Sequence, residues 1–409
     1  MSETFERYSN LLQSSRILVG VTASVAAYRV IDVIRLARRH GASVKVLMTK
    51  KATRYVTRHI LRWASGSTVH VDARGRPLHV ELGEWCSIYI IAPCTLNTLA
   101  KIAHGICDNL VTLTAQYVIG RGKKLLLVPC MSLPMWENSI TQSNVQKLRL
   151  LGIHVLQPDI SEGRAKFPEP ELIVEKMIDL SCPLDMTGIK VLVTAGATRE
   201  YIDPVKFLTT PSTGLTGVYF AREAYARGAS VHLVLGYVSD RAEKLLRDVN
   251  IHVHRVKTTE EMYNVVKSLC QEHAFDIAIF TAAPLDYSLE PKFDKKIDTD
   301  SIEELSIRLK KAPKVIDAAD NVKVKIGFKA EWNISEDLLI SRSTERLQKH
   351  GLDIVVAHDV SRGLGFGTVH DSVLIIDRVG LVHRLEKVHK RELARLVLTR
   401  ALKELRLAR

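Results

Sequence analysis

The pattern of hydrophobic and polar positions repeats in two halves of the chain. Residues 16–44 and 190–231 each begin with an apolar run, continue through small residues and an amphipathic stretch, and end in Gly-Ala-Ser-Val. A helix that ends at Gly41 or Gly228 between two apolar strands is the strand-helix-strand opening of a doubly wound parallel sheet. The pattern therefore predicts an α/β protein with two Rossmann-like parallel-sheet domains.

Further apolar runs predict the remaining strands. Buried-strand candidates lie at 87–93, 124–129, 153–158, 276–283, 325–331 and 353–359. Residues 372–385 indicate a hairpin that turns at 378–380. Pro and Gly residues in 181–190 separate a terminal helix from a new first strand. We therefore expect an N-terminal extension at 1–15, a first domain at 16–180, a linker at 181–188 and a second domain at 189–409.

Composition narrows the class of protein. Of the 409 residues, 46% are hydrophobic and 25% carry charge of both signs, which excludes a disordered chain. No apolar run approaches the ~18 residues that a membrane span needs, and residues 1–16 lack the apolar core of a signal peptide. We therefore expect a cytoplasmic protein with no membrane partner. The six cysteines are scattered without metal-site spacing, which favours reduced thiols over disulfides or structural zinc.

The formal net charge of +13 allows nucleic acid or small anions as partners. Lys and Arg are spread through predicted helices and interrupted by acidic residues. A basic stripe with interleaved aromatic residues, typical of nucleic-acid binding, is not found in the sequence. We expect small anionic substrates and no nucleic acid.

The first turn of each half could hold a phosphate at a helix N-terminus. The turn of the first half contains Thr22, Ala23 and Ser24, and neither half has the Gly-x-Gly-x-x-Gly of dinucleotide sites. The second strand ends at Thr49 without the acidic residue that holds an adenosine ribose. This disfavours NAD and leaves two interpretations, a mononucleotide phosphate bound by hydroxyls and backbone amides, or a turn that caps a helix.

Three polar positions lie near the same predicted sheet edge. His79 precedes a helical stretch, Asn97 follows the strand at 87–93, and Ser132 lies in the run 128–138 that leaves another strand. Taken alone, each is more typical of a structural histidine, a helix cap or packing than of a site. In the second half, the connection after the first strand is longer by 197–214, and its place beyond the carboxyl ends of strands makes it a candidate substrate loop.

The longer motifs resemble one known family, the bifunctional coenzyme A biosynthesis proteins that combine phosphopantothenoylcysteine decarboxylase with phosphopantothenate cysteine ligase. The segments similar to the decarboxylase half are GVTASVAAYR at 20–29, HVELGEW at 79–85, APCTLNTLAKIAHGICDNL at 92–110 and PCMSLPMW at 129–136. The segments similar to the ligase half are TAGATREYIDPVKFLTTPSTGLTG at 194–217, TAAPLDY at 281–287, IGFKAE at 326–331 and DIVVAHDVS at 353–361. The resemblance covers nearly the whole chain after residue 15, in order.

For the first half, the resemblance implies a flavodoxin-like flavoprotein fold, FMN as cofactor and His79 as a catalytic residue. The positions that match the FMN site are Thr22, Ala23, Ser24, Thr49, Thr95 and Asn97. Two motifs depart from the family. Ser132 stands where the family has an Asn that holds the substrate carboxylate, and the segment after Pro158 lacks the lid cysteine that supplies a proton. Cys130 lies near the same sheet edge and could supply it.

For the second half, the resemblance implies ligation of 4'-phosphopantothenate with cysteine through an acyl-nucleotidylate, with CTP or ATP and Mg2+. The positions matching the nucleotide site are Gly196, Ala197, Thr198, Arg199, Ser212, Thr213, Gly214, Asp286, Phe328 and Lys349, with Asp286 also on the metal. Lys296, with Lys295 as the competitor, matches the phosphate-contacting lysine. Thr210 stands where the family has a catalytic Asn, and His358 also replaces an Asn.

The resemblance also implies a homo-oligomer, a dodecamer built from flavoprotein trimers and ligase dimers. Because FMN, phosphopantothenate and a nucleotide are all polyanions, they give the positive charge a use. The two departures leave open a ligase whose N-terminal half is a non-catalytic flavin-binding or structural scaffold. A flavin-linked or NAD-linked oxidoreductase is the alternative from another enzyme class, and a basic nucleic-acid-binding protein is the third.

Overall fold

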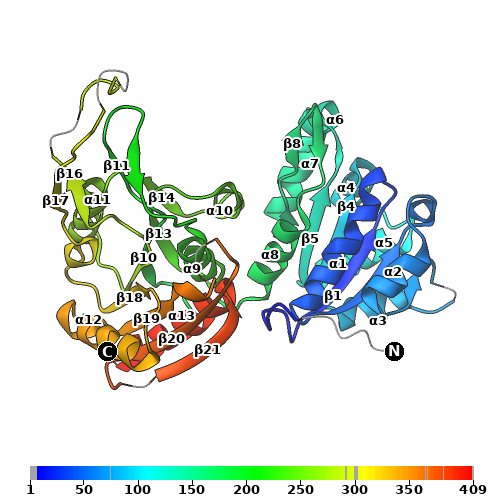
Figure 1. Cartoon of the computed structure of the whole chain (residues 1–409). Coiled ribbons are helices and arrows are strands. Elements are labelled where there is room, and N and C mark those ends of the chain that lie inside the picture. The colour runs from blue at the N-terminus through cyan, green and yellow to red at the C-terminus, as the bar shows by residue number, and fades with distance from the viewer. Residues whose placement is uncertain are drawn as a thin grey trace. The chain divides into compact units, whose positions relative to one another are not determined.

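The computed structural model describes residues 7–407, apart from 74, 291–292, 299–302, 364, 366 and 381. It divides into two compact units, Met1–Cys182 and Pro183–Arg409, which we call the N-terminal and the C-terminal unit. Each unit is an α/β layer structure with a twisted sheet between helices (Figure 1). The doubly wound fold class predicted from the hydrophobic pattern is confirmed for both units.

The N-terminal unit contains a parallel sheet of six strands in the order β3-β2-β1-β4-β5-β7. The strands are β1 (Arg16–Val21), β2 (Ser43–Met48), β3 (Val69–His70), β4 (Ile88–Cys94), β5 (Lys124–Pro129) and β7 (His154–Val155). Every residue of β4 is buried, because helices cover both faces of the sheet. The strand order reverses between β1 and β4, so the carboxyl ends of these two strands border the crevice where ligands bind in such sheets.

Alternate residues of β1 enter two separate apolar cores. Ile17 and Val19 join the core under α1, α2 and α8, whereas Leu18 joins the core under α3, α4, α5 and α7. The helices are α1 (Val30–Arg39), α2 (Arg58–Ser65), α3 (Leu78–Trp85), α4 (Leu96–Ala103), α5 (Leu110–Gly120), α6 (Leu133–Glu137), α7 (Ser139–Leu150) and α8 (Pro170–Ser181), with 3-10 turns η1 (Val25–Arg29) and η2 (Lys50–Arg54). Leu11 and Leu12 of the segment expected to be an extension are buried in the first core.

The C-terminal unit repeats the same strand order and then extends it. Its sheet runs β14-β13-β10-β15-β18-β19-β20-β21, with the last two strands antiparallel. The strands are β10 (Lys190–Ala195), β13 (Ser230–Leu235), β14 (His252–Arg255), β15 (Ile277–Phe280), β18 (Val324–Glu331), β19 (Ile354–Asp359), β20 (His370–Asp377) and β21 (Val382–His389). The predicted hairpin is therefore confirmed, and the reversal of strand order falls between β10 and β15.

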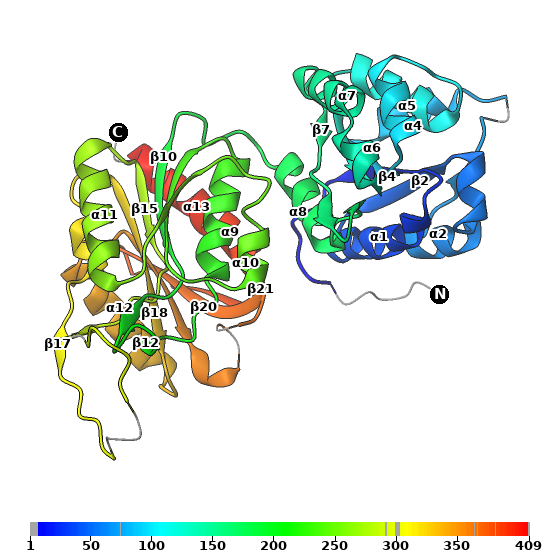
Figure 2. The same cartoon turned by 90° about the horizontal axis from the view of Figure 1, so that it is seen from above.

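Helices cover both faces of this second sheet, with α9 and α13 packed side by side on one face and α11 and α12 on the other (Figure 2). The helices are α9 (Leu215–Ala226), α10 (Asp240–Lys244), α11 (Thr259–Glu272), α12 (Glu336–Lys349) and α13 (Lys390–Leu407), with 3-10 turns η3 (Val315–Ala318) and η4 (Val360–Arg362). Two small antiparallel pairs lie beyond the sheet: β11 (Arg199–Tyr201) with β12 (Phe207–Thr209), and β16 (Tyr287–Leu289) with β17 (Leu309–Lys311). The connection 197–214 is thus a hairpin with a short tail rather than an open loop.

No helix in the described part of the chain is both long and apolar enough to cross a bilayer. The six cysteines, all within the described residues, form no disulfide bonds with one another.

Candidate functional site

The C-terminal unit has a cavity of about 430 Å³ at the carboxyl ends of its central strands. Segments far apart in the sequence meet there: residues 210 and 212–217, residues 280–284 with Asp286, residues 314–316, and residues 328–330. We call this space the C-terminal cavity. It lies at the reversal between β10 and β15, where the doubly wound topology leaves a crevice.

The C-terminal cavity brings together several positions predicted from the sequence. They are Thr210, Ser212, Thr213, Gly214, Asp286 and Phe328. Gly214 is the N-cap of α9 with a φ of 72°, and a Cβ added there would lie 2.3 Å from Val238 Cγ1. Only glycine suits this turn, which places the first turn of α9 against the cavity.

Contacts with neighbouring groups fix three side chains of this set. Thr210 Oγ1 donates a hydrogen bond to the carbonyl of Ala283 at 3.0 Å. Asp286 Oδ1 accepts one from Lys314 Nζ at 2.6 Å, and the Asp286 side chain is 64% exposed. Phe328 packs edge-on against Phe220, with ring centroids 5.5 Å apart. The cavity thus combines a helix N-terminus, a carboxylate, a hydroxyl and an aromatic ring.

The cavity also contains basic side chains that the sequence did not single out. They are Lys314, Lys329, Arg346 and Lys390. Arg346 Nε is buried and has no hydrogen-bond partner among the described residues, and burial lowers the pKa of its guanidinium. A buried donor without a partner marks a place where a ligand acceptor would be favourable. The sequence held no signal for it, because Arg346 sits among other charged residues of α12.

The other predicted residues of this half do not line the C-terminal cavity. Ala197 bridges to Tyr237 and Ala283. Thr198 Oγ1 is hydrogen-bonded to Thr259 Oγ1 at 2.9 Å. The remaining positions outside the lining are Gly196, Arg199, Lys295, Lys296 and Lys349, of which the three lysines are exposed.

The Arg199 side chain lies against two aromatic rings. Its guanidinium lies 3.4 Å from the centroid of Tyr237 and 4.1 Å from that of Phe207. Such stacking holds a cation over π-systems. The arrangement braces the β11–β12 hairpin, because Phe207 belongs to β12.

The N-terminal unit has its own cavity, of about 400 Å³, at the ends of β1 and β5. Its lining residues are Ser24, Val25, Ala26, Tyr28, Arg29, Cys130, Met131, Ser132, Arg164, Ala165, Lys166 and Phe167. A small sheet of β6 (Met131–Ser132), β9 (Arg164–Lys166) and β8 (Asp159–Ser161) forms one wall. Ser132 pairs directly with Arg164 in this sheet. We call this space the N-terminal cavity.

Four predicted hydroxyl residues order the strand ends beside it. Thr22 Oγ1 donates to the carbonyl of Pro93 at 2.7 Å and accepts from the amide of Thr95 at 3.2 Å, which joins the ends of β1 and β4. Ser24, Thr49 and Thr95 cap η1, η2 and α4 respectively. Ala23 is half-buried in the first of these turns.

Asn97 and His79 lie outside the lining of the N-terminal cavity. Asn97 is exposed on the first turn of α4. His79 is half-buried at the start of α3, edge-on to Tyr117 at a centroid distance of 6.1 Å. The structure of one chain does not bring His79 together with Ser132.

Cys130 faces the N-terminal cavity beside Ser24. Ser24 Oγ donates to Cys130 Sγ at 3.9 Å, and burial raises the pKa of the thiol. The sulfur is therefore protonated at neutral pH, the form that can donate a proton. In the described part of the chain, no three His, Cys, Asp or Glu side chains are grouped to hold a metal ion.

Comparison with known proteins gives a consistent result for both units. The family model "Flavoprotein" matches residues 6–181, and the model "DNA/pantothenate metabolism flavoprotein C-terminal domain" matches residues 186–405. Coenzyme A biosynthesis bifunctional protein CoaBC of Thermococcus kodakarensis is 33% identical over 393 residues, which cover 94% of each chain. This chain belongs to the CoaBC family.

Another CoaBC relative, from Methanocaldococcus jannaschii, is 34% identical over 385 residues, which cover 93% of this chain and 91% of that protein. A solved structure of the C-terminal domain of a CoaBC protein is 26% identical, with a TM-score of 0.42, and covers 55% of this chain and 97% of its own. The chain is thus a two-domain enzyme of a coenzyme A biosynthesis family.

Proposed function

We propose that this chain catalyses two consecutive steps of coenzyme A biosynthesis. The C-terminal unit joins 4'-phosphopantothenate to cysteine at the expense of CTP, with ATP as the alternative nucleotide. The N-terminal unit decarboxylates the product, phosphopantothenoylcysteine, to 4'-phosphopantetheine with FMN. The observation that carries the proposal is the C-terminal cavity, where the N-terminus of α9, Asp286 and several cations face one space.

The charge of that cavity suits a nucleoside triphosphate. The first turn of α9 presents backbone N–H groups and the positive end of the helix dipole, a known arrangement for phosphate. Lys314, which precedes η3, Lys329 of β18 and Arg346 of α12 add positive charge. Because Arg346 Nε has no protein partner, a phosphate oxygen can use it without breaking an existing bond.

We assign Mg2+ to Asp286 together with the nucleotide phosphates. Mg2+ commonly uses one or two protein carboxylates plus substrate phosphates, so a cage of protein ligands is not required. The Asp286 carboxylate is largely exposed and is held by the single ammonium of Lys314. Bound Mg2+ would replace Lys314 as the partner of the Asp286 carboxylate, and the Lys314 ammonium would then bind phosphate.

The chemistry then needs few groups from the protein. The carboxylate of phosphopantothenate attacks the α-phosphate, pyrophosphate leaves, and the cysteine amine later displaces the nucleoside monophosphate. Cations and the metal stabilise the charge that develops on phosphate. Thr210 supplies a hydroxyl for the acyl group, and Phe328 offers an aromatic surface for the base. The exposed Lys295 and Lys296 remain candidates for phosphate contact.

The N-terminal cavity has the mixed walls that FMN and an anionic substrate require. Val25, Met131 and Phe167 are apolar, whereas Arg164 and Lys166 are cationic, and the volume lies within the ~300–1,000 Å³ of ligand pockets. When bound, FMN supplies oxidation of the cysteine side chain and its later reduction. We propose that Ser132 and the facing Arg164 hold the substrate carboxylate and that Cys130 provides the final proton.

His79 needs a second subunit in this proposal. It lies outside the cavity of its own chain, and the trimer implied by the resemblance places the flavin between subunits. We therefore propose a homo-oligomer acting in the cytoplasm, with a dodecamer as the expected assembly. Light scattering of the purified protein measures the assembly size, and a monomer would leave His79 without a role in decarboxylation.

One incubation tests the proposed function. The full chain is mixed with 4'-phosphopantothenate, cysteine, Mg2+ and either CTP or ATP, and the products are identified by mass. Phosphopantetheine is the expected product with at least one nucleotide. Phosphopantothenoylcysteine alone would favour the ligase-only alternative, and no product with either nucleotide would contradict the proposal.

A further inference from the structure

Lys390 is a buried lysine that borders the C-terminal cavity. It is the first residue of α13, only 2% of its surface is exposed, and it lines the cavity together with Gly365 and His358. A lysine this buried is rare unless its ammonium is paired. Its position at the cavity wall therefore calls for a chemical explanation.

The surroundings hold Lys390 in place, and no carboxylate of the described residues contacts it directly. Its backbone amide donates to Val369 at 2.9 Å, and Nζ donates to the carbonyl of Gly365. Asp371 lies near enough to act on it electrostatically. That carboxylate, however, already accepts from His358 Nδ1 at 3.0 Å and from the Ser372 amide at 2.9 Å.

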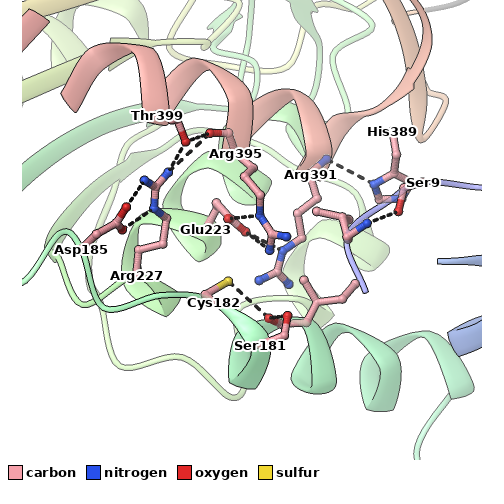
Figure 3. Close-up of polar contacts among 12 residues, drawn as sticks. Ser9, Ser181, Cys182, Asp185, Glu223, Arg227, His389, Arg391, Arg395 and Thr399 are labelled. Atoms are coloured by element: carbon pink, nitrogen blue, oxygen red, sulfur yellow. Dashed lines mark hydrogen bonds and ion pairs between the residues drawn. The ribbon is translucent and has the colours of Figure 1, made fainter. Parts of the chain in front are cut away.

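A buried ion-pair network anchors the start of α13. Glu223 of α9 accepts hydrogen bonds from Arg391 Nε at 3.1 Å and from Arg395 Nε at 2.7 Å (Figure 3). Glu223 and Arg391 are both fully buried. Because α9 begins at Leu215 and α13 begins at Lys390, this network joins the two helices whose first residues line the same cavity.

Burial without a direct carboxylate contact among the described residues disfavours the charged form of Lys390. Burial lowers the pKa of Lys390, and Asp371 of β20 opposes this shift. The cavity lining also contains His358 of β19 and Lys329 of β18, and α9, which packs against α13, carries Glu223 and Arg222. His358 is paired with Asp371, Lys329 with Glu331, and Glu223 with two arginines. A neutral amine can still donate to Gly365 and keeps a lone pair.

We propose that Lys390 is the general base of the ligation step and accepts the proton of the incoming cysteine ammonium. This inference rests on the proposed function of the C-terminal unit. The proton moves from the α-ammonium of cysteine to Lys390 Nζ, and the freed amine attacks the acyl carbon. The C–N bond forms, the bond from the acyl carbon to the phosphate oxygen breaks, and the nucleoside monophosphate leaves. The second amine proton passes to the leaving phosphate or to water.

The test compares two nucleophiles on the same acyl-nucleotidylate in the full-length protein. Hydroxylamine is uncharged at neutral pH and needs no base, whereas cysteine enters as an ammonium. The variants are Lys390→Gln and Lys390→Arg, with Lys403→Gln on the exposed side of α13 as the matched control. Arginine keeps the positive charge and the donor to Gly365 but cannot accept a proton at neutral pH, so it separates a base from a structural cation.

We expect both Lys390 variants to form the hydroxamate within about threefold of the wild type. Ligation of cysteine at pH 7 should fall by ~10²-fold or more, the usual size of a general-base contribution. The deficit should shrink towards pH 9, because free cysteine then carries its own neutral amine. Lys403→Gln should match the wild type with both nucleophiles.

Two results would overturn the inference. Equal losses with hydroxylamine and cysteine would show a structural or phosphate-binding role, and unimpaired cysteine ligation in Lys390→Arg would show that only the charge matters. If the wild type forms neither hydroxamate nor peptide bond with either nucleotide, the proposed function itself fails, and the inference fails with it.

Discussion

Gly217 is the point of closest approach between α9 and the sheet. A Cβ at this position would lie 2.3 Å from Thr281 Oγ1 and 2.4 Å from Ala195 Cβ. Alanine normally stabilises a helix interior by ~1 kcal/mol over glycine. Here it must push α9 away from β10 and β15, which also moves the start of α9 at the C-terminal cavity.

We therefore predict that Gly217→Ala destabilises the C-terminal unit by ~1–3 kcal/mol, the usual cost of overpacking. The measurement is the calorimetric melting temperature of this unit. Gly120→Ala is the control, because a Cβ at that helical position meets no atom within 4 Å. A melting temperature raised by Gly217→Ala would contradict the close approach.

Arg346 supplies the second prediction at this scale. If its unpartnered Nε serves the nucleotide, Arg346→Met should raise the KM for the nucleotide by ~10–100-fold, as expected for a lost charged hydrogen bond of ~1.5–3 kcal/mol. Lys267→Met, at an exposed position of α11, is the control and should leave the KM unchanged. The initial rate of pyrophosphate release at varied CTP gives both values. An unchanged KM in Arg346→Met would exclude this role.

At the scale of elements, the contact of α9 with α13 depends on a buried charge. Removing one partner of a buried ion pair leaves the other charge uncompensated and costs ~3–5 kcal/mol. Glu223→Gln should therefore lower the melting temperature of the C-terminal unit markedly. Glu345→Gln, on the exposed side of α12, should have little effect. Equal melting temperatures for the two variants would show that the network is not needed for stability.

Edge strand β14 carries part of a histidine cluster. The ring of His232 lies 4.6 Å from that of His252, 5.3 Å from that of His254 and 4.8 Å from that of His273. Burial, followed by these neighbours and Lys190, lowers the pKa of His232 to about 4. The pKa of His254 is lowered too, first by burial and then by His252, while Glu272 opposes the shift.

The cluster predicts a pH dependence of stability. Between the unfolded pKa of ~6.5 and the folded value of about 4, the unfolded chain binds more protons at His232. Stability is therefore lost as pH falls through this window. The melting temperature of the C-terminal unit should drop less from pH 7 to pH 5 in His232→Gln than in the wild type. An identical drop in both proteins would contradict this explanation.

At the scale of the whole molecule, the sequence predicts best those elements whose formation depends on residues close together in the chain. Buried parallel strands are continuous apolar runs, so β1, β4 and β5 could be predicted from hydrophobicity alone. The two-residue strand β3 has no such pattern, because its place depends on pairing with β2.

The residues of the C-terminal cavity also fall into two groups, those whose location the sequence predicts and those whose location depends on tertiary packing. Thr210 follows β12, Asp286 lies in the segment between β15 and β16, and Phe328 lies in the second half of β18. All three are near the topological switch, where sequence position predicts location. Arg346 and Lys390 come from helices, and only tertiary packing brings their side chains into the cavity wall. Arg199 was predicted from its motif to face a phosphate, yet its guanidinium stacks between two aromatic rings. Whether it also contacts a nucleotide stays a prediction.

The central claim is that one chain performs both reactions in succession. The most direct measurement uses cysteine labelled with 13C at its carboxyl carbon, incubated with the protein, 4'-phosphopantothenate, Mg2+ and CTP or ATP. We predict labelled CO2 and nucleoside monophosphate in equal amounts, together with unlabelled phosphopantetheine. Nucleoside monophosphate with all the label retained in phosphopantothenoylcysteine would contradict the claim.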